Sequence, residues 1–207
     1  MKRILIGTTN KGKIDELVSV FKDLQKYGIE LVTLENMLKL MKPEETGATF
    51  EENAKLKAQF YSNKTGLPAI ADDGGLMIDI LNGEPGVKSR RWRGFEATDE
   101  ELIEFALEKL QGIPVEKRTA RLETCLCFYD FDKQIFLTES ESIEGWISEE
   151  PCPIVTPGYP YRALFMVKEF NKFYDELTEE EHAQVNHRIK AAKRLLLKIE
   201  QDLLGNN

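Results

Sequence analysis

The chain has few cysteines, few histidines and no long hydrophobic run. It contains three cysteines and two histidines among 207 residues. Cys125, Cys127 and Cys152 are odd in number and form no CxxC pair, so we expect free thiols in a reducing compartment. No stretch approaches the roughly 18 apolar residues of a membrane helix, and the run that follows Met1 is too short for a secretory signal. These absences predict a cytoplasmic protein without a membrane segment.

The chain also lacks an excess of positive charge. Its net charge of −8 argues against a nucleic-acid binder, whose surface would be basic. A local cluster of lysines can still bind a small anion, and carboxylates can hold a divalent metal. The hydrophobic share of 42% and the charged share of 31% are ordinary for a globular protein. Because no repeat, low-complexity tract or linker interrupts the sequence, we expect a single domain over residues 1–207.

Hydrophobic spacing predicts alternating helices and strands. Apolar residues three and four apart over 14–24 predict a helix that ends near Gly28. The pattern Thr-x-x-Glu, typical of helix starts, occurs at Thr49, Thr98 and Thr178. This order favours an α/β fold with a mixed β-sheet and flanking helices. Strands are expected over 4–6, 31–34, 69–71, 118–129 and 134–143, and the third of these is expected to end at the Asp-Asp-Gly-Gly sequence 72–75. A loop is expected over 151–160 and a C-terminal helix from 178 to 203.

The polar segment TTNKGK lies between the first expected strand and the first helix. Hydroxyls, an amide, a glycine and free backbone N–H groups at a helix N-terminus suit a phosphate. Lys13 adds a charge that can reach the anion. The alternative is a simple helix N-cap with surface lysines. The candidate phosphate ligands are Thr8, Thr9, Asn10, Lys11, Gly12 and Lys13.

Two acidic residues, Asp72 and Asp73, follow an apolar strand and precede two glycines. Adjacent like charges repel, and a divalent cation such as Mg²⁺ resolves the repulsion. Glu44 and Glu45, which precede a Thr-Gly turn, can supply another oxygen ligand. The alternative is an ordinary acidic turn.

Two basic groups complete the candidates. Lys55 and Lys57 lie on one expected helix, where a solvated helix face is the alternative. His187 and Arg188 can donate hydrogen bonds to a purine carbonyl, and His182 lies nearby in the sequence. For these histidines the alternative is an ordinary surface position.

In this order, the segments resemble the inosine/xanthosine triphosphate pyrophosphatase family over nearly the whole chain. The similar segments are TTNKGK with Glu16, ETGATFEENAKLKA, TGLPAIADDGGL, GEPGVKSRRWRG, KRTARLETCLCF and NHR before a helix. The resemblance implies an elongated mixed α/β fold with two lobes around a central groove, usually in a homodimer. It also implies Mg²⁺-dependent hydrolysis of XTP, ITP or dITP to a monophosphate and pyrophosphate, which removes deaminated purine nucleotides from the precursor pool.

The resemblance implies a role for each matching residue. Asp73 would be the general base and a metal ligand, with Glu44 as its acidic partner and Glu45 as the alternative. Lys13 and Lys57 would neutralise the triphosphate. A metal ion polarises a phosphate and lowers the pKa of an attacking water, which a carboxylate can then deprotonate. The remaining implied contacts are the phosphate cradle of residues 8–13 and base contacts from His187 and Arg188.

The chain departs from the family pattern mainly where the base is expected to bind. Arg162 replaces a carboxylate, and Tyr159 can still stack on a base. Two readings therefore stay open beside the main one: a pyrophosphohydrolase with altered base specificity, and a nucleotide-binding protein with little turnover. Arg162 favours the latter, whereas the retained phosphate and carboxylate residues argue against it. The chain also has Gly74 in place of a serine, His182 in place of a lysine and Asn186 in place of a serine. The candidate substrate-binding residues in this part of the site are Gly74, Tyr159 and His182.

Overall fold

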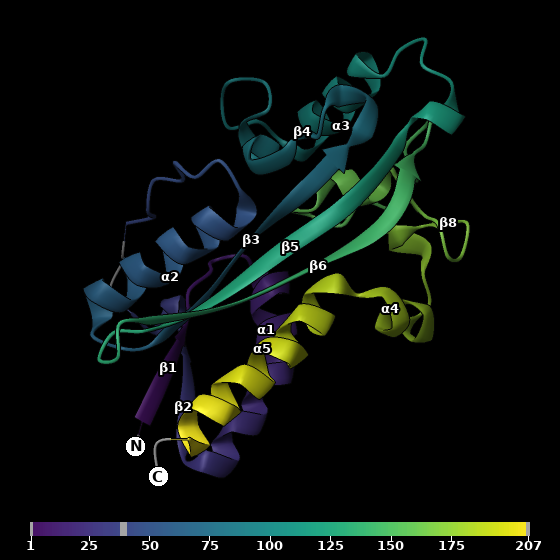
Figure 1. The fold of residues 1–207 in the computed structure, drawn as a ribbon. Coiled ribbons are helices and arrows are strands. Elements are labelled where there is room, and N and C mark those ends of the chain that lie inside the picture. Colours follow the sequence, from purple (N-terminus) through teal and green to yellow (C-terminus); the bar gives the residue numbers. More distant parts are fainter. Residues whose placement is uncertain (1, 38–40, 206–207) are drawn as a thin grey trace. The chain divides into compact units, whose positions relative to one another are not determined.

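The computed structural model describes residues 2–37 and 41–205, and these residues form a mixed α/β fold (Figure 1). The described strands form an 8-stranded sheet in the order β2-β1-β3-β5-β6-β7-β8, with β4 paired to β3. Strand β1 is parallel to both β2 and β3, whereas the pairs β3–β4, β6–β7 and β7–β8 are antiparallel. The expected mixed α/β class is confirmed.

The elements follow one another along the chain as the alternating pattern predicts. The strands are β1 (Lys2–Ile6), β2 (Ile29–Thr33), β3 (Ala69–Ile78), β4 (Glu84–Pro85), β5 (Thr119–Asp130), β6 (Ile135–Ile147), β7 (Phe165–Val167) and β8 (Lys172–Phe173). The α-helices are α1 (Lys11–Phe21), α2 (Phe50–Thr65), α3 (Asp99–Lys109), α4 (Glu179–Val185) and α5 (His187–Leu204). No helix among the described residues is long and apolar enough to cross a membrane.

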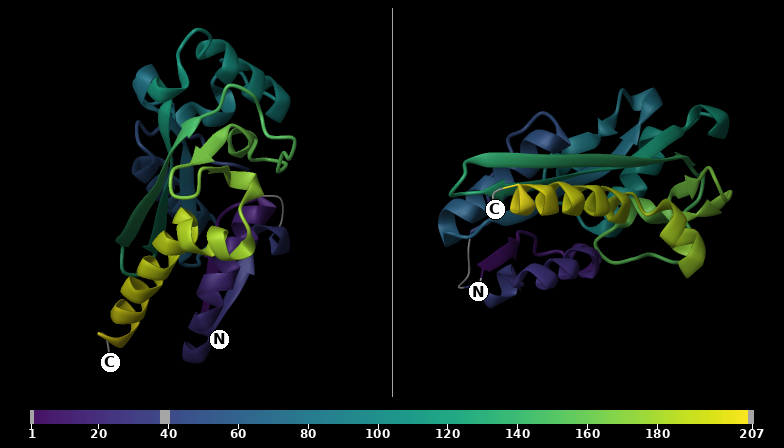
Figure 2. Two further views of the ribbon diagram at one scale, coloured as in Figure 1. Left: turned by 90° about the vertical axis from the view of Figure 1, so that its right-hand side faces the viewer. Right: turned by 60° about the horizontal axis from the view of Figure 1, so that its bottom comes forward.

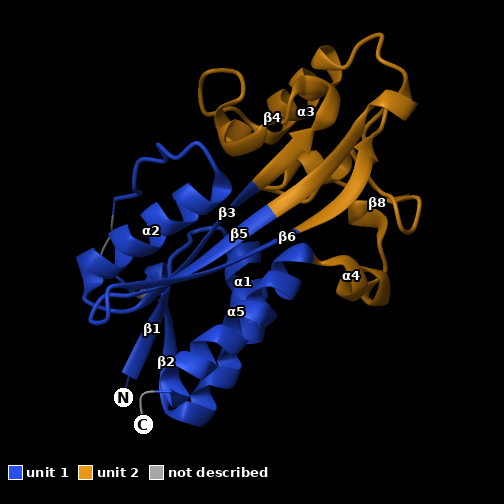
Figure 3. Cartoon of the chain, viewed as in Figure 1, with its two compact units in different colours: residues 1–74, 124–141, 187–207 blue, residues 75–123, 142–186 orange. Residues whose placement is uncertain are grey.

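Two compact units share the chain, and each takes several separate segments (Figure 3). Unit 1 contains residues 1–74, 124–141 and 187–207, and unit 2 contains residues 75–123 and 142–186. Three strands, β3, β5 and β6, therefore contribute residues to both units.

The core of unit 1 is built where helix α5 packs against helix α1, and the two helices lie side by side in Figure 2. Leu17 and Phe21 of α1 and Leu195 of α5 are fully buried. Burying one such side chain stabilises the fold by about 1.5–3 kcal/mol. This packing fixes the first residues of α1 and α5, which carry several candidate site residues.

The core of unit 2 gathers around helix α3. Leu102 of α3 packs with Leu76 and Ile78 from the second half of β3 and with Phe165 of β7, and all four are fully buried. A complete capping box at Thr98 and Glu101 begins α3, as the sequence pattern predicts.

Strand β3 differs from its expected form. The sequence suggests an end at residues 72–75, because paired glycines often break a strand. The strand instead continues to Ile78, and Leu76 and Ile78 extend its buried side. Asp72 and Asp73 therefore lie inside a strand rather than in a turn after one.

Two helices also differ in extent from their expected forms. The first α-helix ends at Phe21 and continues as a 3-10 helix, and Gly28 ends it with a φ of 72°. The expected C-terminal helix is divided at Asn186, whose ψ of 99° is not helical, into α4 and α5. This division makes His187 and Arg188 the first residues of α5.

Candidate active site

The polar segment 8–13 leads from β1 into the first turn of α1. Asn10 is the N-cap of α1, and its Oδ1 accepts a hydrogen bond from Lys13 N at 3.1 Å. Thr8 Oγ1 accepts one from Asn10 N at 3.2 Å. Before the segment, Gly7 N donates to Ile70 O at 2.6 Å, and a Cβ on Gly7 would come within 2.9 Å of the Tyr61 ring. The start of the segment is therefore held tightly against β3.

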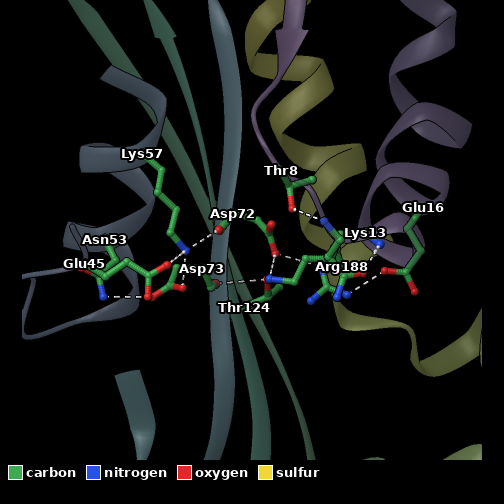
Figure 4. Close-up of polar contacts among 11 residues, drawn as sticks. Thr8, Lys13, Glu16, Glu45, Asn53, Lys57, Asp72, Asp73, Thr124 and Arg188 are labelled. Atoms are coloured by element: carbon green, nitrogen blue, oxygen red, sulfur yellow. Dashed lines mark hydrogen bonds and ion pairs between the residues drawn. The ribbon is translucent and has the colours of Figure 1, made fainter. Parts of the chain in front are cut away.

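Asp72 is the centre of a charge network that includes the end of this segment (Figure 4). Its Oδ2 lies 2.9 Å from Lys13 Nζ and 3.1 Å from Arg188 Nε. Arg188 Nη1 in turn lies 2.6 Å from Glu16 Oε2. The Asp72 side chain is fully buried, so α1, β3 and α5 are joined by charged hydrogen bonds around a buried carboxylate.

Asp73 is the centre of a second network. Its Oδ1 lies 2.7 Å from Lys57 Nζ, and its Oδ2 accepts a hydrogen bond from Asn53 Nδ2 at 3.1 Å. Lys57 Nζ also lies 2.8 Å from Glu45 Oε1 and donates to Asp72 O at 3.2 Å. Thr124 Oγ1 of β5 donates to Asp73 O at 3.4 Å.

The two aspartates point to opposite sides of β3, as Figure 4 shows. Successive side chains of a strand alternate between the two faces of a sheet, and β3 is extended at both positions. The adjacent carboxylates therefore do not face each other, which the sequence-based argument for a shared cation assumed. Each aspartate instead has its own basic partners, Lys13 and Arg188 for Asp72 and Lys57 for Asp73. All of these residues belong to unit 1.

The basic partners keep Asp72 ionised. Burial alone would raise the pKa of Asp72, but the positive charges of Lys13, Arg188 and Lys57 outweigh it and hold the pKa well below its usual range. Burial also lowers the pKa of Lys13 despite the attraction of Asp72, and the nearby charges of Arg188 and Lys57 lower it further. The Asp72 carboxylate is consequently the fixed anion around which these cations are arranged.

The pKa of Asp73 is shifted in the opposite direction to that of Asp72. Burial raises its pKa above the usual value, although Lys57 offsets part of the effect. Burial alone would lower the pKa of Lys57, but Asp73, Asp72 and Glu45 together raise it, so Lys57 stays charged. A carboxylate with a raised pKa is a stronger proton acceptor than an ordinary one.

The carboxylates around Lys57 are suited to a divalent cation. No group of three or more His, Cys, Asp or Glu side chains that could hold a metal ion occurs within residues 2–37 and 41–205. Mg²⁺ usually takes only one or two protein carboxylates and completes its shell with water and substrate phosphates. Asp73 and Glu45 already share one cation, the Lys57 ammonium. The buried Oδ1 of Asp72 accepts no hydrogen bond from the described residues.

The two adjacent glutamates have different surroundings. Glu45 is half-buried and contacts Lys57, whereas Glu44 is exposed. The geometry thus brings Glu45 close to Asp73, while the sequence resemblance favours Glu44. Which of them binds metal stays a prediction.

The residues expected to contact the base are distributed over both units. Arg188 is buried and bound to Asp72 and Glu16, and His187 beside it is buried as well. In unit 2, the Arg162 guanidinium lies 3.8 Å from the centre of the Tyr159 ring and 4.7 Å from that of Tyr174. His182 of α4 contacts Tyr174 edge-on, at 5.1 Å between ring centres. Gly74 is the last residue of unit 1 within β3.

The structure places three further residues in the two networks, and the sequence predicts no role for them. They are Glu16, Asn53 and Thr124. Glu16 follows Lys13 by three residues and so lies on the same side of α1, which is a signal that the sequence carries. The partner of Glu16 is 172 residues away along the chain, so no local pattern could identify it.

Known proteins of similar sequence show the family to which this chain belongs. A profile of the Ham1 family matches residues 4–198. The chain belongs to the Ham1 family. It is 39% identical to a dITP/XTP pyrophosphatase of Escherichia coli O157:H7 over 95% of this chain and 97% of that protein. A dITP/XTP pyrophosphatase of Bacillus licheniformis is 37% identical over 97% of this chain and all of that protein.

The solved structure of a HAM1 protein from Coxiella burnetii has the same fold. Its TM-score is 0.84 at 32% identity, with 97% of this chain and all of that chain covered. The resemblance inferred from the sequence motifs is therefore confirmed, and the mixed α/β sheet of this Ham1 protein is that of its relatives.

Proposed function

We propose that this Ham1 protein hydrolyses non-standard purine nucleoside triphosphates, such as XTP, ITP and dITP, to the monophosphate and pyrophosphate. The main support is the geometry around Asp73, a buried carboxylate whose two oxygens contact Lys57 and Asn53. The names of the E. coli and B. licheniformis relatives support the same activity. The reaction would remove deaminated purines from the nucleotide pool.

The phosphates would bind at the start of α1. Free N–H groups of a helix N-terminus attract anions, and Lys13 is directed to this end of the helix by its contact with Asp72. Lys57 would neutralise charge from the other side of β3. Lys13 contacts Asp72 and Lys57 contacts Asp73, so a triphosphate would exchange part of these contacts for its own.

Asp73 would act as the general base. Its carboxylate can accept a proton from the water that attacks the phosphate, and its contact with Lys57 places a positive charge next to the reacting group. Hydrolysis would break the bond between the α- and β-phosphates. Fixed hydrogen-bond donors at the base would accept a 6-oxo purine and leave adenine poorly matched.

Hydrolases of the Ham1 family generally require a divalent metal, and we propose Mg²⁺ as that metal in this protein. Asp73 and a glutamate of the pair Glu44–Glu45 would hold it. When bound, Mg²⁺ polarises phosphate oxygens and lowers the pKa of a coordinated water.

Product analysis tests this proposal. The purified protein is incubated with ITP or XTP, with and without Mg²⁺, and the products are identified by phosphorus NMR. We expect the monophosphate and pyrophosphate only when Mg²⁺ is present. Release of orthophosphate, or the absence of any product, would contradict the proposed reaction. The expected homodimer and cytoplasmic location are separate proposals, and sedimentation equilibrium tests the first.

A further inference from the structure

Asn53 is a buried side chain that carries out no chemical step in the reaction proposed above. It lies in the first turn of α2, and only 1% of its surface is exposed. Its Nδ2 donates to Asp73 Oδ2 at 3.1 Å, and its Oδ1 accepts from Gly47 N at 2.8 Å. One amide thus joins the candidate base to the segment that carries Glu44 and Glu45.

The orientation of this amide follows from its partners. Gly47 N–H can only donate, so it requires the oxygen of the Asn53 amide. The nitrogen of the amide must then face Asp73, where its hydrogen is donated to the carboxylate. Aspartate at position 53 would have the same shape but no hydrogen to donate to Asp73.

Gly47 is closely fitted to Asn53. A Cβ on Gly47 would lie 2.7 Å from Asn53 Oδ1 and 2.9 Å from Asn53 N, which is closer than side chains pack. The neighbouring Glu52 accepts a hydrogen bond from Ala48 N at 2.7 Å and fixes the following residue as well. The requirement for glycine here comes from close approach to α2, because its φ is not among the positive values.

The contacts form a closed ring. From Asp73 the ring passes through Asn53 to Gly47, along the chain to Glu45, and through Lys57 back to Asp73. Two of its connections end on the two oxygens of the same carboxylate. A movement of Asp73 alone, or of the acidic segment alone, would break one of the contacts in this ring.

We propose that Asn53 is a positioning residue, which holds Asp73 and the acidic segment 44–45 in a fixed relation so that both can face one divalent cation. The inference rests on the proposed function. Groups that orient metal ligands commonly change metal affinity or activity by about 10- to 100-fold when they are removed.

The test compares wild type with Asn53→Ala and Gly47→Ala. The first variant removes both hydrogen bonds of the amide. The second adds a methyl group that must separate the acidic segment from α2, while the chemical groups of Asn53 and Asp73 are unchanged. Asn63→Ala is the matched control, because Asn63 is exposed on the same helix. Mn²⁺ affinity is measured by electron paramagnetic resonance, with the metal alone and with a non-hydrolysable ITP analogue.

We expect both variants to raise the Mn²⁺ dissociation constant and the half-activating Mg²⁺ concentration by about tenfold or more. At saturating Mg²⁺, kcat should fall while KM for the triphosphate changes little. Asn63→Ala should match wild type. A merely structural role would lower the melting temperature without moving the metal constant of the folded fraction.

Unchanged metal constants in Asn53→Ala would overturn the proposal. If that variant does not fold, the same result for Gly47→Ala overturns it. If wild type cleaves no triphosphate, the proposed function fails, but the Mn²⁺ titration without nucleotide still decides the role of Asn53. If wild type is active and both variants behave like it, only the role of Asn53 is wrong.

Discussion

At the scale of single residues, Asp72 and Asp73 are neighbours in the sequence with different environments. Because β3 is extended, they point to opposite faces of the sheet and acquire different partners. Asp72 is held ionised by Lys13 and Arg188, whereas burial raises the pKa of Asp73. One carboxylate therefore organises the cations Lys13 and Arg188, and we propose the other as the proton acceptor.

Replacing Asp73 tests its role as the base. Asp73→Asn keeps the size of the side chain but removes the proton acceptor, so kcat should fall by at least about a hundredfold, within the range expected for general-base catalysis. Circular dichroism should show an intact fold. Asp23→Asn, at an exposed position, should retain full activity. Full activity of Asp73→Asn would exclude the proposed mechanism.

Replacing Asp72 affects stability. Asp72→Asn leaves the charges of Lys13 and Arg188 without their buried carboxylate, which should lower the free energy of unfolding by about 3 kcal/mol at pH 7. Because the folded pKa of Asp72 is depressed, its contribution is complete above the unfolded value of about 3.9 and is lost as the pH falls through the folded pKa. Urea unfolding should therefore give the same difference in the free energy of unfolding between wild type and variant at pH 7 and at pH 5. Below pH 4 this difference should be smaller. A difference that already disappears at pH 5 would contradict this.

At the scale of elements, the first turn of α1 carries Lys13, which contacts Asp72. Lys13→Ala should raise KM for the triphosphate by about tenfold, as expected for the loss of one hydrogen bond to a charged group. Lys22→Ala, at an exposed position just after α1, is the control. If steady-state kinetics with ITP and XTP were the same for both variants, the loop would be only a helix cap.

The acidic segment before α2 offers a paired comparison. Glu45→Gln should raise the half-activating Mg²⁺ concentration by about tenfold or more, and Glu44→Gln should have a smaller effect, because only Glu45 contacts Lys57. Titrations of activity against Mg²⁺ measure both. A larger effect for Glu44→Gln would favour the assignment that the sequence resemblance implies.

Local signals predicted most elements but not their contacts. The capping boxes at Thr98 and Thr178 could be recognised because all of their groups lie within four residues. The continuation of β3 is not predicted by local signals, because paired glycines are typical of a strand end, whereas the burial of Leu76 and Ile78 depends on the folded core. The contact of Arg188 with Asp72 joins residues 116 positions apart, and only the folded sheet brings them together.

At the scale of the whole molecule, the phosphate and carboxylate residues lie in unit 1, and Tyr159, Arg162 and His182 lie in unit 2. The departures from the family pattern are mainly in unit 2. Arg162 is stacked on two tyrosines, where its donors replace the acceptor that a carboxylate would offer. We predict that acceptor-rich rings such as xanthine suit these donors best.

The most direct test of the central claim is a comparison of kcat/KM for XTP, ITP, GTP and ATP, measured as pyrophosphate release in one buffer with Mg²⁺. A base that leaves one buried donor unpaired loses roughly 1–3 kcal/mol, or about five- to a hundredfold in kcat/KM. We predict that XTP is cleaved best and ATP worst by a ratio in this range. Equal values for ATP and XTP would contradict the proposed activity on non-standard purines.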